Sequence, residues 1–66
     1  MQIVLNGQMH EIDRNATVAA LLDHAGYATR RVAVEVNREI VPKSEHPVRQ
    51  LHEGDQVEVV HALGGG

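Results

Sequence analysis

The stretch QIVLNGQMHEI, residues 2–12, decides the fold. An Asn-Gly pair between two apolar segments is the strongest short-range signal for a β-hairpin, because both residues of its tight turn need positive φ. The pattern therefore predicts an antiparallel hairpin of strands 1–5 and 8–12. One face of this hairpin, which we expect to face the core, carries Ile3, Leu5, His10 and Ile12. His10 is then expected at the edge of the core.

The segment that follows, TVAALLDHAG at residues 17–26, has the period of a short amphipathic helix. Its apolar residues stand at i, i+3, i+4 and i+7 and are Val18, Leu21, Leu22 and Ala25. Thr17 is a suitable N-cap and Gly26 a suitable residue to end the helix. We therefore expect one helix with a single buried stripe.

Three further segments have the alternating pattern of β-strands. In RVAVEVN the valines at 32, 34 and 36 alternate with other residues, and REIVP reads as a brief partner strand that Pro42 stops. After an EGD turn, QVEVVHAL at residues 56–63 places Val57 and Val59 on one face and Glu58 and Val60 on the other. Between these strands, KSEHPVRQ at residues 43–50 is polar and contains Pro47, which predicts a surface loop.

The order of these elements indicates the fold class. A hairpin, a crossover helix, a strand, a short strand and a final strand predict an α+β domain with one helix packed across a mixed sheet. This is the plan of the β-grasp fold. We expect one β-grasp domain at residues 1–63 and a flexible glycine tail at residues 64–66, because glycine loses the most backbone freedom on ordering.

Composition excludes several functional classes. The chain has no cysteine, a net charge of −3, and six Lys and Arg residues that are scattered along it, with Arg30 and Arg31 the sole basic pair. One tyrosine and no other bulky aromatic residue leave little on which nucleic acid bases could stack, so we expect no nucleic acid partner. The first residues have no signal peptide pattern and no membrane span, which predicts a soluble, cytoplasmic protein.

Side-chain chemistry offers no convincing catalytic or metal site. The five histidines include no pair at helical i, i+4 spacing and no cysteine assists them, so we expect no metal. A Ser/His/Asp arrangement could be assembled on paper from Ser44, His46 and Asp55. No Gly-x-Ser-x-Gly motif surrounds the serine, and we interpret these three residues as surface polar groups.

The sequence ends HALGGG and offers one other reactive group, the α-carboxylate of Gly66. The glycines do not match a phosphate-binding loop, which needs a following helix. A carboxylate on an unbranched arm can instead be threaded into a narrow channel of a partner. It becomes an electrophile when a partner joins it to the α-phosphate of ATP. A frayed, inert terminus is the alternative.

Four segments, in this order and at this overall length, resemble the ThiS family of sulfur carriers in thiamine biosynthesis, small β-grasp proteins related to ubiquitin. They are MQIVLNG (1–7), TVAALLDHAG (17–26), VAVEVNREIVPKSEH (32–46) and EGDQVEVVHALGGG (53–66). The resemblance implies a carrier and not an enzyme, with no bound cofactor.

The resemblance also implies that a ubiquitin-activating-type, ThiF-like adenylyltransferase adenylates Gly66 with ATP. A sulfur-donating enzyme then supplies sulfur, and the resulting thiocarboxylate passes it to a ThiG-like thiazole synthase. Gly65 and Gly66 match the terminal diglycine of the family, and Gly64 is an additional glycine that we place with them in the part of the tail that enters the partner.

The residues before the glycines suggest a docking surface. Val60, Ala62 and Leu63 are expected to form a small apolar patch beside the arm, although Val60 and Leu63 could equally fill the core. Two other functions remain open: the related carrier of molybdopterin biosynthesis, and a ubiquitin-like interaction module. The stretch VNREIVPKSEH favours the thiamine branch over the molybdopterin branch.

Overall fold

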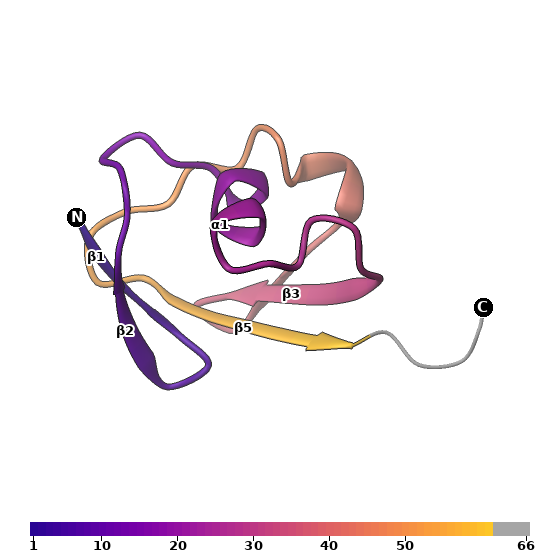
Figure 1. The fold of residues 1–66 in the computed structure, drawn as a ribbon, viewed down its shortest axis with the longest axis horizontal. Coiled ribbons are helices and arrows are strands. Elements are labelled where there is room, and N and C mark those ends of the chain that lie inside the picture. The colour runs from indigo at the N-terminus through magenta and orange to yellow at the C-terminus, as the bar shows by residue number, and fades with distance from the viewer. Residues whose placement is uncertain (62–66) are drawn as a thin grey trace.

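The computed structural model describes residues 1–61 and contains five strands, one α-helix and one 3-10 helix (Figure 1). In chain order they are β1 (Gln2–Leu5), β2 (Gln8–Glu11), α1 (Val18–His24), β3 (Val32–Val36), β4 (Glu39–Val41), η1 (Lys43–Glu45) and β5 (Gln56–His61). The predicted helix and all of the predicted strands are present. The strand bounds of the first hairpin fall within one residue of those predicted.

The five strands form one mixed sheet in the order β2-β1-β5-β3-β4. β5 occupies the centre, parallel to β1 and antiparallel to β3. Figure 1 shows α1 on one side of this sheet. The predicted α+β architecture is therefore confirmed, and the sheet places the strand that leads to the predicted tail between two neighbours.

The first hairpin turns as the Asn-Gly pair predicts. Asn6 and Gly7 have φ values of 50° and 82°, and Leu5 pairs directly with Gln8. This is the geometry of a two-residue turn with positive φ at both positions. Ile3 and Leu5 are buried and His10 is half-buried opposite Ile3, so the predicted core face and the edge position of His10 are confirmed.

The helix begins and ends at the predicted residues. The hydroxyl of Thr17 accepts a hydrogen bond from the backbone N–H of Ala20 at 3.2 Å, as an N-cap does. Gly26 follows the last turn with φ of 87°. The apolar stripe packs on the sheet in a core formed by Ile3, Leu5, Val18, Leu21, Leu22, Val34, Val36, Val41, Leu51, Val57 and Val59.

Leu21→Ala is expected to lower the free energy of unfolding by about 2–5 kcal/mol, because Leu21 is 1% exposed and its truncation leaves a cavity. Denaturant unfolding followed by circular dichroism measures the change. Asp23→Ala, on the exposed side of the same helix, is the matched control and is expected to change stability by less than about 0.5 kcal/mol. Equal midpoints for the two variants would contradict the assignment of this core.

The prediction of a surface loop at residues 43–50 is only partly correct. His46 is 8% exposed, and its Nε2 lies 3.1 Å from the carbonyl oxygen of Val41. The carbonyls of His46 and Arg49 accept hydrogen bonds from the N–H groups of Ala19 and Val18. The segment satisfies donors that the first turn of a helix leaves open, and this is why it packs against α1.

Asp55 is also buried, contrary to its interpretation as a surface residue. It is 9% exposed, and its two carboxylate oxygens accept hydrogen bonds from Asn37 Nδ2 at 2.9 Å and from the backbone N–H of His52 at 2.8 Å. Asn37 Oδ1 in turn accepts from the N–H of Gln56. These bonds connect the turn between β3 and β4 to the turn that immediately precedes β5.

Candidate functional site

The site predicted at the end of the chain depends on β5, which leads to it. β5 pairs with β3 from Val57 up to its last residue, His61, which pairs with Val32. On its other side β1 pairs with it only as far as Val57. The last described residues of β5 therefore need support from elsewhere on the side where β1 has ended.

Asn6 provides this support from the turn of the first hairpin. Its Oδ1 accepts a hydrogen bond from the N–H of Val59 at 2.8 Å, and its Nδ2 donates to the carbonyl of Val59 at 3.2 Å. The backbone N–H of Asn6 donates a hydrogen bond to the carbonyl oxygen of Val57. The side-chain amide of Asn6 thus bonds to the backbone of β5 where β1 no longer pairs with it, and so extends the hydrogen bonding on this side of β5 to Val59. The hairpin motif alone did not predict this role.

Val60 lies on the face of the sheet opposite to the core. It is 58% exposed, its neighbour Val59 is buried, and it pairs across the sheet with Ala33. The prediction that Val60 faces away from the core is confirmed, and ordinary core filling is wrong for this residue. The other members of the predicted patch, Ala62 and Leu63, lie outside the described residues. So do the predicted tail residues Gly64, Gly65 and Gly66.

The Ser/His/Asp combination that the sequence allows on paper is not assembled as a triad. The imidazole of His46 contacts the carbonyl of Val41, and the carboxylate of Asp55 accepts from Asn37 and His52. Ser44 is exposed on η1. These bonds give His46 and Asp55 structural tasks, in keeping with their burial.

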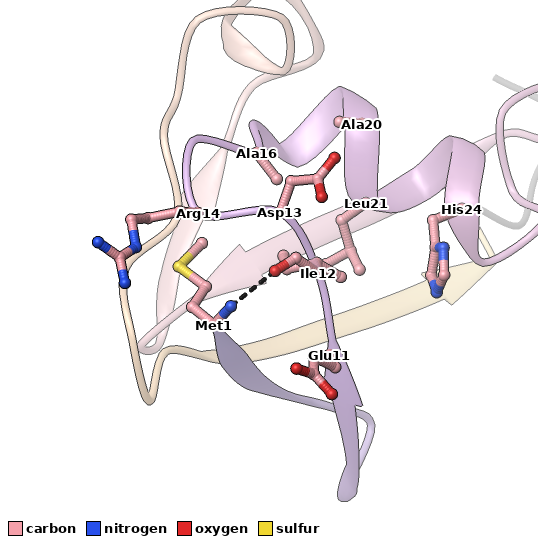
Figure 2. Close-up of a pocket in the computed structure, with 9 residues that line it drawn as sticks. All are labelled: Met1, Glu11, Ile12, Asp13, Arg14, Ala16, Ala20, Leu21 and His24. Atoms are coloured by element: carbon pink, nitrogen blue, oxygen red, sulfur yellow. Dashed lines mark hydrogen bonds between the residues drawn. The ribbon is translucent and has the colours of Figure 1, made fainter.

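The hollow in Figure 2, of about 430 Å³, lies at the other end of the molecule, beside the N-terminus. The α-ammonium of Met1 donates a hydrogen bond to the carbonyl of Ile12 at 2.7 Å there. Glu11, Arg14 and His24 lie apart around the hollow and do not converge on one point. Among residues 1–61, no group of three His, Cys, Asp or Glu residues could hold a metal ion.

A second hollow, of about 490 Å³, lies beside the end of β5. Its lining includes Leu22, Tyr27, Arg30, Arg31, Lys43 and His46. Arg30 and Arg31 form a basic pair in the sequence, and the fold brings Lys43 into the lining of the same hollow. Of the helices formed by residues 1–61, none is long and apolar enough to cross a membrane.

Comparison with known proteins relates the whole chain to one family. The profile of the ThiS family matches residues 3–66. The chain is 29% identical to the sulfur carrier protein ThiS of Escherichia coli (strain K12), with both chains covered in full. A crystal structure of the thiamine biosynthesis protein ThiS from Geobacter metallireducens superposes with a TM-score of 0.85 at 29% identity, again over both whole chains.

A longer relative shares more of the sequence. All 66 residues align at 44% identity with a protein named thiazole synthase from Paramagnetospirillum magneticum (strain ATCC 700264 / AMB-1). The chain spans only 20% of the length of that relative.

Proposed function

This chain belongs to the ThiS family, the sulfur carriers of thiamine biosynthesis, and on that premise we propose that Gly66 is the residue on which it carries sulfur. The observation that carries the proposal is that the family match runs through to residue 66 and so includes all three glycines. The fold supports it, because β5 is the central strand of the sheet and directs the chain toward that residue.

The chemistry takes place at the carboxylate of Gly66 in two steps. An oxygen of the carboxylate attacks the α-phosphate of ATP, pyrophosphate leaves, and an acyl-adenylate forms. Hydrosulfide supplied by the sulfur donor then attacks the carbonyl carbon, AMP leaves with one of the original carboxylate oxygens, and a proton is lost, so that the chain ends in a thiocarboxylate. The chain contributes the electrophile, and the ATP belongs to the activating partner, so the chain itself binds no cofactor. Cysteine is absent from it, and a terminal thiocarboxylate requires none.

Three partners follow from this chemistry. A ThiF-like adenylyltransferase forms the adenylate, a sulfur-donating enzyme supplies the nucleophile, and a ThiG-like thiazole synthase receives the sulfur. The relative named thiazole synthase supports the last of these, because one fifth of that polypeptide aligns with this whole chain. We place these reactions in the cytoplasm, where ATP is available to the activating partner.

The apolar patch of Val60, Ala62 and Leu63 is the proposed docking surface for these partners. The exposed side chain of Val60 supports this role, because it is a large apolar group on the open face of the sheet. It also lies six residues before Gly66 in the sequence. A partner that holds the tail therefore has this residue within a short stretch of chain from the reacting carboxylate.

Intact-mass spectrometry tests the proposed function. We expect the chain to gain about 16 mass units when it is incubated with the adenylyltransferase, the sulfur donor and ATP, because sulfur replaces one oxygen. Omission of ATP is the control and should leave the mass unchanged. Addition of the thiazole synthase with its substrates should return the mass to its starting value. An unchanged mass, with partners that are active on another carrier, would refute the proposal.

A further inference from the structure

The second hollow concentrates positive charge at one end of an otherwise acidic chain. Arg30, Arg31 and Lys43 are three of the six Lys and Arg residues in a chain of net charge −3. None of the described residues that line this hollow is acidic. A concave surface with charge of one sign focuses the electric field and attracts groups of the opposite sign. We call this surface the basic hollow.

The basic hollow has charged walls and an apolar interior. Arg30 and Lys43 are exposed, whereas Leu22 is buried and Tyr27 and Val32 are half-buried. The walls come from two segments, the α1–β3 connection and η1. A hollow of about 490 Å³ has room for one or two side chains of another molecule.

The basic hollow opens next to the point at which the described chain ends. Tyr27 lines it, and the ring of Tyr27 lies 6.3 Å from the ring of His61, measured between centroids. Val32, also in the lining, is the sheet partner of His61. In Figure 1 the start of β3 and the arrowhead of β5 lie at the same end of the molecule. A molecule in this hollow is therefore adjacent to the start of the segment that leads to Gly66.

We propose that the basic hollow receives an acidic segment, with Asp or Glu side chains, of the adenylating partner. This inference rests on the proposed function and names a second contact for the same partner. Carboxylates pair with Arg30 and Lys43 at the rim, and the apolar part of the segment packs over Tyr27. The contact holds the body of the carrier while the partner takes in the tail.

The local backbone favours a protein segment over a free phosphate as the occupant. Phosphate sites are commonly built from backbone N–H groups that converge at a helix N-terminus or in a nest. Here the N–H of Arg30 is already bonded to the carbonyl of Tyr27. The positive charges of Arg30 and Lys43 are carried on long side chains from separate segments. This arrangement suits an extended acidic surface better than a single small anion.

The test reverses charge in the basic hollow and compares it with reversal elsewhere. The variant is Arg30→Glu with Lys43→Glu; Arg31 is unchanged because it already has an interaction of its own. The matched control is Arg14→Glu with Arg38→Glu, two exposed arginines outside the basic hollow. Both double variants change the net charge equally, and melting curves verify that both are folded.

The readout is the steady-state rate of adenylation by the adenylyltransferase of the same organism, at several concentrations of carrier and salt. We expect KM for the carrier to rise about tenfold or more in the hollow variant, with kcat nearly unchanged, because a rim charge acts mainly on association. The KM of wild-type carrier should rise with salt, whereas that of the hollow variant should change little. The control variant should behave as wild type.

Equal KM values for the two double variants would overturn the inference while leaving the proposed function intact, because wild-type carrier would still be adenylated. Inhibition of the wild type by millimolar inorganic phosphate that is lost in the hollow variant, with KM in the absence of phosphate unaffected by the hollow substitutions, would assign the hollow to a free phosphate and would also overturn it. Failure of wild-type carrier to be adenylated at all would instead refute the proposed function.

Discussion

Deletion of Gly66 is expected to abolish adenylation of the chain while leaving its fold unchanged. The truncated chain still ends in a glycine carboxylate, but that group lies one residue, about 3.3–3.6 Å, short of its position in the full tail. In-line attack on a bound α-phosphate tolerates only displacements that are far smaller than this. The fold should not respond, because every core residue among the described residues 1–61 lies between Ile3 and Val59. ATP–pyrophosphate exchange measures the first effect and thermal melting the second.

Gly66→Ala is the matched control for length. It keeps the same number of residues between β5 and the terminal carboxylate and adds only one methyl group. It should therefore retain more exchange activity than the deletion. Exchange at the wild-type rate in the truncated chain would show that Gly66 is not the activated residue.

The fold could be predicted where short-range signals decide it. Asn6 and Gly7 fix the first hairpin because positive φ at two successive positions needs such residues. Thr17 and Gly26 mark the two ends of the helix. An N-cap and a residue with positive φ affect only the backbone a few positions away, so both signals can be recognised in the local sequence. Local rules of this kind also gave the alternation that places Val60 away from the core.

Strand order and the interior of the loop at residues 43–50 could not be predicted, because both depend on pairings between distant positions. β1 lies parallel to β5, more than 50 residues later in the sequence, and periodicity does not encode that choice. The burial of His46 depends on the N–H groups of α1 that its segment satisfies. A polar sequence with a proline gives no sign of these partners.

The β3–β4 turn also depends on a distant partner. Arg38 has φ of 71° without being glycine, and Asn37 beside it has φ of 50°. Asn37 bonds to Asp55 and to the backbone of Gln56, and these contacts hold the turn in place. The sequence revealed the two short strands but not how their turn is secured.

The candidate site divides in the same way. Gly66 follows from the chemistry of a carboxylate on glycine and from the resemblance to the ThiS family. The contacts that support β5 and form the basic hollow are tertiary. Asn6 and Val59 are 53 positions apart in the sequence, and Arg30 and Lys43, which line the same hollow, are 13 positions apart. The spacing of residues in the sequence therefore predicts neither arrangement.

Gly65→Val should remove most thiocarboxylate formation without changing the fold. Valine adds a branched side chain next to the reacting residue and restricts φ and ψ there. If the tail must pass through a narrow opening in the adenylyltransferase, this side chain clashes and displaces the carboxylate. A displacement of about 1 Å can reduce a rate by about 100-fold. The fraction of chain that gains the sulfur mass shift, measured over time, gives the effect.

Gly64→Ala is the control that separates threading from a general effect of altering the tail. It adds a smaller group one residue further from the reacting carbon, so its rate should remain within a few-fold of wild type. Circular dichroism and melting temperature should be the same for both variants, since Val59 is the last core residue in the described part of the chain. A full mass shift in Gly65→Val, at the wild-type rate, would mean that the partner does not constrain the tail at this position. The glycines would then need another explanation than passage through a channel, and a freely accessible terminus would account for the same chemistry.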